Sequence, residues 1–251
     1  MPDLRFAAPV ERRAALITGG ARGIGAATAL RLAEEGRDIV IADLLEERAQ
    51  ETVAAIEALG QSALFVKTDI TDPLQVDAAV AQAVEQYGRL DILVCCAGIL
   101  GWEKPFLQQT VEQFSRVMQI NVHGVYYAHQ AAVPHMLERG WGRCVTISSS
   151  ARNGSPNQVP YSVSKGAVMS FIRSLGNVWP KQGVFVNGVE PGRALTDMVV
   201  PRFNEEHLRD PGNPMGRYSD AAEVAEVIEF LCSERNTYTT GAVWSVKGSS
   251  G

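Results

Sequence analysis

Tyr161 and Lys165 have the residue types and the spacing needed to move a proton. They stand four residues apart in a stretch of helical periodicity, so both side chains are expected on one face of a helix. A phenol has a pKa of about 10 and is a poor base at neutral pH. An ammonium group within a few ångströms favours the phenolate, so Lys165 is expected to lower the pKa of Tyr161. The alternative is an exposed Tyr–Lys pair on a helix surface.

Three serines, Ser148, Ser149 and Ser150, follow the apolar run 144–147. Sites in open α/β sheets form at the carboxyl ends of the strands. A hydroxyl placed there can bind the oxygen of a carbonyl substrate. A solvated passage from strand to loop would account for two of the three serines equally well.

A glycine-rich turn, with Gly19, Gly23 and Gly25, follows the predicted strand 14–18 and runs into a helical pattern. Glycines let the backbone turn tightly and approach a pyrophosphate, and the start of a helix presents N–H groups to it. A turn of this composition without a ligand is the alternative. The strand–turn–helix order favours a dinucleotide site.

Asp43 ends the second predicted strand, 18 residues after Gly25. A carboxylate at this place accepts hydrogen bonds from the adenosine ribose and repels a 2′-phosphate, which favours NAD over NADP. No basic residue follows immediately to neutralise such a phosphate. Arg22 in the glycine turn argues the other way, because its side chain could reach a 2′-phosphate. Asp43 could also serve as a helix N-cap.

Short apolar runs alternate with longer helical patterns along the whole chain. The predicted strands are 14–18, 39–42, 64–67, 92–96, 144–147, 184–189 and 243–246. The predicted helices are 24–35, 46–59, 73–86, 111–138, 162–179 and 221–233. Continuous apolar strands are typical of a sheet covered by helices on both faces. We therefore expect an α/β fold, with a doubly wound, seven-stranded parallel sheet of the Rossmann type.

No linker or repeat divides the sequence, so residues 1–251 are expected to form one domain, with an N-terminal arm over 1–13. The proline-rich segment 191–220 is predicted to be a substrate loop or lid, since long loops in compact domains are usually functional. Its apolar residues, Met198, Val199, Val200 and Phe203, would cover the substrate or simply pack on the body.

The composition narrows the possible functions. With 23 basic and 28 acidic residues the net charge is −5, which disfavours binding to nucleic acid or anionic lipid. The sequence lacks a signal peptide and an apolar stretch long enough to span a bilayer, so a cytoplasmic protein is expected.

The cysteines, among them the adjacent Cys95 and Cys96, are expected to be reduced core thiols. His123, His129 and His135 recur every six residues and cannot share a metal on one helix face. Trp102 is the best aromatic candidate for lining a substrate cleft.

Several motifs together resemble the short-chain dehydrogenase/reductase family. They are Thr18-Gly19-x3-Gly23-Ile24-Gly25, Asp69, Asn121-Val122-x-Gly124, the Ile-Ser-Ser end of the fifth strand, Tyr161-x3-Lys165 and Pro191-Gly192-x3-Thr196. The resemblance extends from about Ala14 to Gly248 and keeps the motifs in order.

The resemblance implies hydride transfer between a nicotinamide and an alcohol or carbonyl carbon. Tyr161 would be the general acid/base, and Lys165 would lower its pKa and hold the nicotinamide ribose. Ser149 would orient the carbonyl, and the backbone carbonyl of Asn121 would support a water relay to the lysine. The candidate cofactor-binding residues are Gly19, Arg22, Gly23, Ile24, Gly25, Asp43, Asp69, Ile70, Ala97, Gly98, Pro191, Gly192 and Thr196.

The sequence departs from the family pattern in places. Cys95 and Cys96 stand where the family usually has two asparagines, so two amides are lost. The strand register selects Ser149 as the catalytic serine, whereas the commoner spacing to the tyrosine selects Ser148. We follow the register, because strand residues alternate faces and loops tolerate deletions. Near the C-terminus, Lys247 replaces the usual acidic residue.

The expected activity is that of an NAD-dependent alcohol dehydrogenase/ketone reductase acting on a secondary alcohol or its ketone, with no metal. A 3-oxoacyl-[acyl-carrier-protein] reductase using NADPH is the alternative enzyme, although the acidic composition and Asp43 count against it. A catalytically silent NAD-binding scaffold or sensor is the non-enzyme alternative. The resemblance also implies a homotetramer, with helices 111–138 and 162–179 at the interfaces.

Overall fold

The computed structural model describes residues 12–196 and 213–248. Its strands are β1 (Ala14–Thr18), β2 (Asp38–Asp43), β3 (Ala63–Lys67), β4 (Ile92–Cys95), β5 (Gly142–Ile147), β6 (Val184–Pro191) and β7 (Val243–Val246). Its α-helices are α1 (Gly23–Glu34), α2 (Glu46–Ala58), α3 (Pro73–Tyr87), α4 (Val111–Met118), α5 (Gly124–Arg139), α6 (Val159–Leu175) and α8 (Ala221–Cys232).

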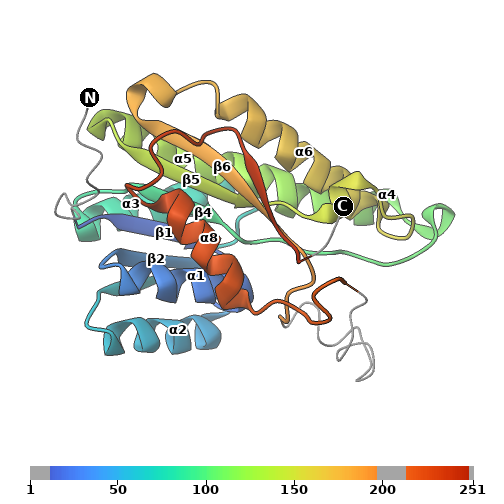
Figure 1. Ribbon diagram of the computed structural model, residues 1–251, viewed down its shortest axis with the longest axis horizontal. Helices are drawn as coiled ribbons and strands as arrows, with labels where there is room; N and C mark the ends of the chain where they lie inside the picture. The colour runs from blue at the N-terminus through green and yellow to red at the C-terminus, as the bar shows by residue number, and fades with distance from the viewer. Residues whose placement is uncertain (1–11, 197–212, 249–251) are drawn as a thin grey trace.

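All seven strands pair in parallel, in the order β3-β2-β1-β4-β5-β6-β7 (Figure 1). The predicted fold class is confirmed. Chain order reverses between β1 and β4, so the connections leave these neighbouring strands in opposite directions across the sheet. In open α/β sheets this switch point opens a crevice beyond the carboxyl ends of the strands.

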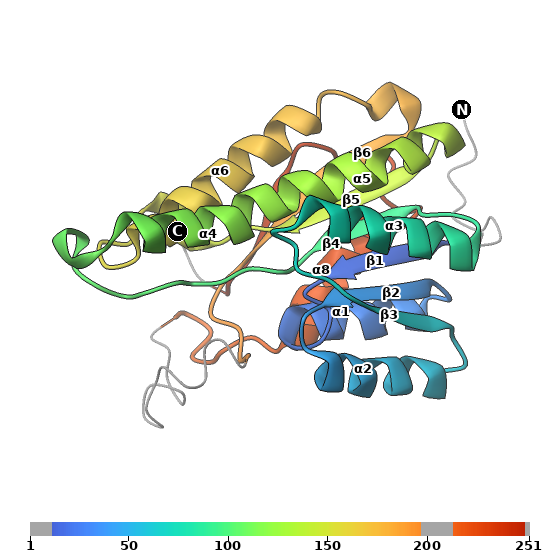
Figure 2. The same ribbon diagram turned by 180° about the vertical axis from the view of Figure 1, so that it is seen from behind.

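Helices cover both faces of the sheet. One face of the sheet packs on α1, α2 and α8, which lie together in Figure 1. The other face packs on α3, α5 and α6, which lie toward the viewer in Figure 2. Burial on both sides explains why the strand sequences are continuously apolar. No helix within the described ranges is long and apolar enough to cross a membrane.

Two helices differ from their predicted form. The helix predicted over 111–138 contains a π turn, Gln119–His123, between α4 and α5. The helix predicted over 162–179 ends at Leu175, where Gly176 packs so closely on Gly241 that a Cβ on Gly176 would lie 2.2 Å from the Gly241 Cα. Such a contact between two backbones lies outside what helical periodicity can predict.

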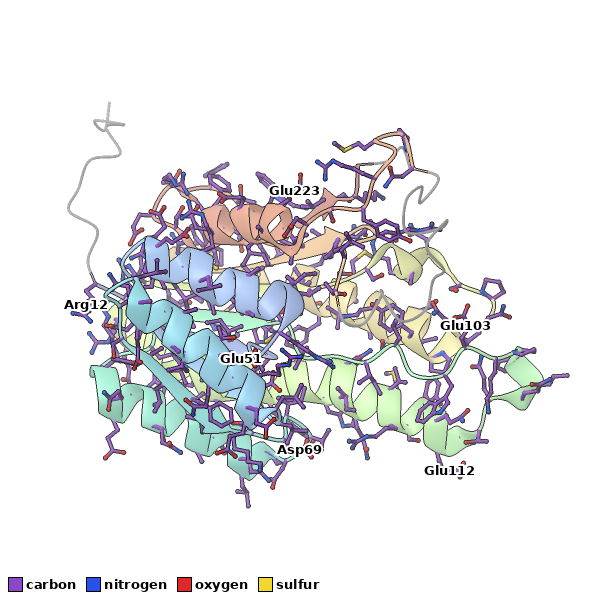
Figure 3. The ribbon with its side chains drawn as sticks, turned by 90° about the horizontal axis from the view of Figure 1, so that it is seen from below. Arg12, Glu51, Asp69, Glu103, Glu112 and Glu223 are labelled. Carbon is purple, nitrogen blue, oxygen red and sulfur yellow. The ribbon has the colours of Figure 1, made fainter. Side chains whose placement is uncertain are left out.

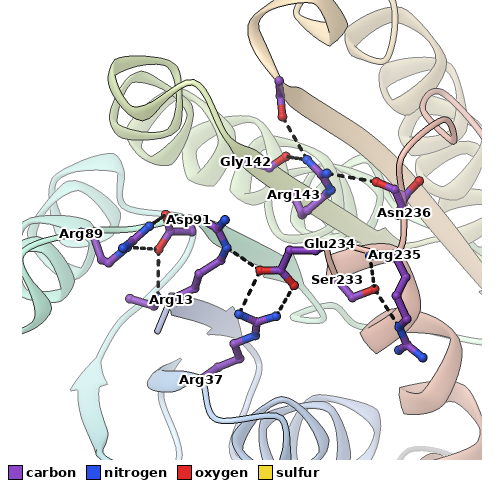
Figure 4. Close-up of polar contacts among 12 residues, drawn as sticks. Arg13, Arg37, Arg89, Asp91, Gly142, Arg143, Ser233, Glu234, Arg235 and Asn236 are labelled. Atoms are coloured by element: carbon purple, nitrogen blue, oxygen red, sulfur yellow. Dashed lines mark hydrogen bonds and ion pairs between the residues drawn. The ribbon is translucent and has the colours of Figure 1, made fainter. Parts of the chain in front are cut away.

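Ion pairs close the amino edge of the sheet (Figure 4). Buried Asp91 accepts hydrogen bonds from Arg89 at 2.6 and 2.8 Å and from the backbone of β1. Glu234, just after α8, accepts from Arg13 at 2.7 Å and from Arg37 at 2.6 Å. The network ties the starts of β1 and β4 to the end of α8. The opposite, carboxyl edge is therefore the one left to hold ligands.

Candidate active site

A cavity of about 1270 Å³ follows the carboxyl ends of the strands, lined by segments after β1 to β6. Pockets for one small ligand measure roughly 300–1,000 Å³, so this one has room for a dinucleotide together with a small substrate. It brings together every predicted cofactor-binding residue: Gly19, Arg22, Gly23, Ile24, Gly25, Asp43, Asp69, Ile70, Ala97, Gly98, Pro191, Gly192 and Thr196. Ser149, Tyr161 and Lys165 line the same cavity.

The glycine turn has a shape that only glycine permits. Gly19 has φ +70°, and a Cβ on it would lie 2.6 Å from the Ala97 backbone nitrogen. A Cβ on Gly25 would lie 2.0 Å from the Gly19 carbonyl oxygen. The helix α1 begins here, and its N-cap residue, Arg22, makes no side-chain capping hydrogen bond. Exposed backbone N–H groups at a helix start fit a pyrophosphate, such as the one that a nicotinamide dinucleotide carries.

Asp43 is the last residue of β2 and stands on the cavity wall. Its Oδ2 accepts a hydrogen bond from the Ala21 backbone at 3.1 Å, and its Oδ1 accepts one from Leu45 at 3.0 Å. The carboxylate therefore also fixes the glycine turn. The alternative reading of Asp43 as the N-cap of α2 is wrong, because that position belongs to Leu45.

Asp69 follows β3 at the same end of the cavity and is labelled in Figure 3. Its Oδ1 accepts hydrogen bonds from the Thr71 backbone at 2.9 Å and the Thr71 hydroxyl at 2.7 Å. These bonds lower the pKa of Asp69, and the charge of Arg116 adds to the effect. Asp43 and Asp69 are the two carboxylates at the β2–β3 end of the cavity, and Arg116 lies near Asp69.

Tyr161 and Lys165 lie in the first turns of α6 and meet at the cavity wall. The Lys165 Nζ is 5.6 Å from the centroid of the Tyr161 ring and donates a hydrogen bond of 2.7 Å to the Ile147 carbonyl. Burial lowers the pKa of Lys165 to about 8. The ammonium is held at the end of β5 beside the Tyr161 ring, and a neighbouring positive charge favours the phenolate form.

Asn121 occupies the π turn and is buried. Its side chain accepts a hydrogen bond from the Ile99 backbone nitrogen at 2.8 Å and donates to the Ile99 carbonyl at 2.9 Å and to the Ser164 hydroxyl at 3.0 Å. Ser164 in turn donates to the Tyr161 carbonyl at 2.7 Å. The side chain therefore ties the loop after β4 to the start of α6. A role in a proton relay would fall to the Asn121 backbone carbonyl.

Ser148 and Ser149 both line the cavity but differ in exposure. Ser148 is 1% exposed, and its hydroxyl has no hydrogen-bond partner among the described residues. Ser149 is partly exposed, and its Oγ accepts a hydrogen bond from the Ala151 backbone at 3.2 Å. A hydroxyl that accepts one bond can still donate its own hydrogen. Of the two serines, Ser149 is therefore the more exposed and keeps a hydrogen that it can donate.

The prediction of two core thiols is wrong for Cys96, which is partly exposed and lines the cavity. Cys95 is buried as expected, and burial raises its pKa to about 12. Burial also raises the pKa of Cys96. Residues within a strand alternate between faces, but β4 ends at Cys95, so Cys96 is the first residue beyond the strand, where alternation no longer decides burial.

The remaining predictions concern side chains expected to contact the substrate. Trp102 is 43% exposed and is not among the described residues that line the cavity. The apolar lid residues Met198, Val199, Val200 and Phe203 lie outside the described residues. The cavity is also lined by residues that the sequence does not predict, among them Arg116, Asn153, Gln158 and Asn213. They come from α4 and from loops, where no local motif marks them.

Comparisons with known proteins agree with this geometry. The family model described as short chain dehydrogenase matches residues 13–207. A 2-dehydro-3-deoxy-L-rhamnonate dehydrogenase (NAD(+)) from Sphingomonas sp. (strain SKA58) is 35% identical over 246 residues, which cover 97% of each chain. An L-rhamnose 1-dehydrogenase (NAD(P)(+)) from the same strain is 36% identical over 245 residues, covering 95% of this chain and 96% of the relative.

The fold of this chain is also similar to that of a solved structure. The crystal structure of carveol dehydrogenase from Mycobacterium avium in complex with NAD superimposes with a TM-score of 0.90 at 27% identity. The match covers 94% of this chain and 96% of that one.

Proposed function

Because this chain belongs to the short-chain dehydrogenase/reductase family and is an oxidoreductase that acts on CH–OH groups, we propose that Tyr161, Lys165, Ser149 and Asn121 carry its reaction. The substrate would be a secondary alcohol or its ketone. The observation that carries the proposal is the Tyr161–Lys165 pair, 5.6 Å from ring centroid to Nζ, in the cavity that also holds the glycine turn.

The proposed chemistry divides among these side chains. A nicotinamide cofactor, when bound, supplies or accepts the hydride. For reduction, the Ser149 hydroxyl donates a hydrogen bond to the carbonyl oxygen, and Tyr161 gives that oxygen its proton. The Lys165 ammonium stabilises the phenolate left behind. Asn121 holds the start of α6 in place through Ser164, and its backbone carbonyl is proposed to support the relay that reprotonates the tyrosine.

The choice between the two serines can be tested by a matched pair of variants. Ser149→Ala is expected to lower kcat/KM for ketone reduction by roughly 10²-fold, the effect of losing one hydrogen bond to a developing oxyanion. Ser148→Ala, which alters a buried hydroxyl, should have a much smaller effect. Steady-state kinetics with NADH would measure both. The reverse order of effects would assign the role to Ser148.

We further propose that NAD is preferred over NADP, because the Asp43 carboxylate would repel a 2′-phosphate. The preference for NAD is the ratio of kcat/KM with NAD to kcat/KM with NADP. Asp43→Ala is expected to lower this ratio on the order of tenfold. Asp43→Asn is the companion variant, since it removes the charge and can keep an oxygen acceptor for the turn. Equal use of both cofactors by the unaltered protein would refute the carboxylate argument.

A carrier-protein reductase using NADPH remains the second candidate, and Arg22 on the cavity wall is the residue that favours it. A silent scaffold is disfavoured by the complete set of Asn121, Ser149, Tyr161 and Lys165. Absorbance screening of sugars, hydroxy acids, acyl thioesters, hydroxysteroids and simple ketones would separate these possibilities.

Assembly and location are also proposals. Exposed apolar side chains on α4, α5 and α6, such as Val111 at 75% and Tyr126 at 47% exposure, support a homotetramer built through these helices. Four unpaired cysteines in the structure support a reducing, cytoplasmic location.

A further inference from the structure

Arg152 connects the turn that carries Ser149 to a neighbouring strand. Ser149 is the N-cap of the 3₁₀ turn Ser150–Asn153, and Arg152 lies within that turn. The Arg152 backbone N–H donates a hydrogen bond to the Ser149 carbonyl at 3.1 Å. The Arg152 guanidinium extends to β6 and donates to the carboxylate of Glu190. One residue is therefore bound to the candidate catalytic serine by its backbone and to the sheet by its side chain.

Glu190 is a rigid anchor for this arginine. It lies near the end of β6, between β5 and β7, and its side chain is fully buried. Besides the bond from Arg152, the carboxylate accepts hydrogen bonds from Lys247 Nζ at 3.0 Å and from the Ser245 hydroxyl at 3.4 Å. Burial raises the pKa of Glu190, but the bonds from Lys247 and Arg152 outweigh it and hold the pKa below its usual value. The anchor is thus an ionised carboxylate that is held from both sides of β6.

The serine hydroxyl is held from within the same turn. Its Oγ accepts a hydrogen bond from the Ala151 backbone N–H at 3.2 Å. A hydrogen bond between charged groups is stronger than one between neutral groups, and a buried carboxylate is destabilised when a cationic partner is removed. The Arg152–Glu190 pair therefore restrains the turn more firmly than the neutral bonds within it. Loss of the pair would let the turn, and the Ser149 hydroxyl with it, shift relative to the sheet.

Glu190 also adjoins the loop proposed to bind the cofactor. Pro191 and Gly192 follow it directly and line the cavity. The Gly192 backbone N–H donates a hydrogen bond to the Val246 carbonyl at 2.9 Å, which fixes this loop on β7. The carboxylate therefore lies between the serine turn and the candidate cofactor loop. Such placement matters for hydride transfer, because a displacement of about 1 Å can slow an enzyme on the order of 10²-fold.

We propose that Arg152 and Glu190 are positioning residues, which act through Ser149 by holding its hydroxyl in place beside the cofactor site. This inference rests on the proposed function, since it concerns the serine of that same site. A residue that acts only through Ser149 loses its effect on the reaction once the Ser149 hydroxyl is absent. A residue that only stabilises the fold has the same effect with and without that hydroxyl.

A double-mutant cycle on Arg152 and Ser149 tests the inference. The wild type, Arg152→Met, Ser149→Ala and the double variant are compared by kcat/KM for reduction of a ketone that the absorbance screen identifies. Arg152→Met is expected to lower kcat/KM about tenfold in the wild type, because the serine hydroxyl is displaced. In the Ser149→Ala enzyme the same change should cost less than about twofold. Arg152→Gln serves the same cycle if Arg152→Met does not fold.

Amide hydrogen exchange gives a readout that needs no turnover. The N–H groups of Ala151 and Arg152 donate to Ser149, so their exchange reports how firmly the turn is held. Arg152→Met and Glu190→Gln should both speed deuterium uptake in a peptide that spans residues 149–154. Arg152→Lys, which can still bond to Glu190, should keep most of the protection and most of kcat/KM. The affinity for NADH, measured by fluorescence titration, should stay close to that of the wild type in each variant.

A second buried carboxylate provides the matched control. Glu229 lies on α8, is buried, and accepts a hydrogen bond from the Arg235 guanidinium. Neither of these two residues is among the described residues that line the cavity. Glu229→Gln therefore removes a comparable buried charge away from the serine turn. It should leave both kcat/KM and the exchange of residues 149–154 unchanged, whereas Glu190→Gln should lower kcat/KM about tenfold.

The other outcomes separate this inference from the proposed function. If Arg152→Met leaves kcat/KM unchanged, or lowers it by the same factor with and without the Ser149 hydroxyl, the inference alone fails. It also fails if Glu229→Gln loosens the turn and slows the reaction as much as Glu190→Gln does. A Ser149→Ala enzyme as active as the wild type, or a protein that reduces no ketone, would overturn the proposed function and the inference with it.

Discussion

Tyr161→Phe is expected to lower kcat/KM for any secondary alcohol that the enzyme accepts by about 10²- to 10⁴-fold, because the variant keeps the ring and loses the proton that the reaction moves. NADH binding should change little, since the glycine turn, Asp43 and Asp69 are untouched. Steady-state kinetics and a fluorescence titration with NADH would measure the two effects separately.

Tyr238→Phe is a matched control for this variant. Tyr238 lies between α8 and β7 and is 98% exposed. Loss of this phenol should leave kcat/KM unchanged. A Tyr161→Phe enzyme as active as the wild type would show that another group transfers the proton.

Lys165→Met should abolish most of the activity and also change how stability depends on pH. Burial lowers the Lys165 pKa from 10.5 to about 8, so the folded state disfavours the ammonium. The cost is fully present below pH 8, where Lys165 is charged in both states, and vanishes as the pH rises toward 10.5. A shift of this size corresponds to roughly 3 kcal/mol of unfolding free energy.

Urea unfolding of the two proteins between pH 7 and pH 10.5 would test this linkage. Relative to Lys165→Met, the wild type should gain roughly 3 kcal/mol as the pH rises through this window. Comparing the change with pH also cancels the constant loss of the hydrogen bond to the Ile147 carbonyl. Lys181→Met, which alters an exposed lysine, should follow the wild type. A constant difference across the window would contradict the buried-ammonium interpretation.

Much of the fold could be predicted because its signals are local. The strands β1 and β7 have the predicted bounds, since each is a short apolar run with clear ends. The glycine turn could be recognised in the sequence because only glycine fits where two backbone segments approach so closely. Tyr161 and Lys165 were recognisable because a spacing of four residues fixes their common helix face.

The remaining features depend on contacts between distant segments. The π turn at Asn121 inserts into a helix without altering its apolar pattern, so periodicity could not reveal it. Cys96 meets the cavity because of where β4 ends. The contact of Glu190 with Arg152 and Lys247 joins residues 38 and 57 positions away along the chain. Lys247 was visible only as a departure from the family pattern.

The proposed roles of Tyr161 and Lys165 can be tested most directly by the pH at which the Tyr161 phenolate forms in the NAD-saturated enzyme. It can be read as the difference in phenolate absorbance between each protein and the same protein carrying Tyr161→Phe. We expect the phenolate to form at a lower pH in the wild type than in Lys165→Met, because the ammonium, 5.6 Å from the centre of the ring, stabilises it. Identical titrations in the two proteins would contradict it.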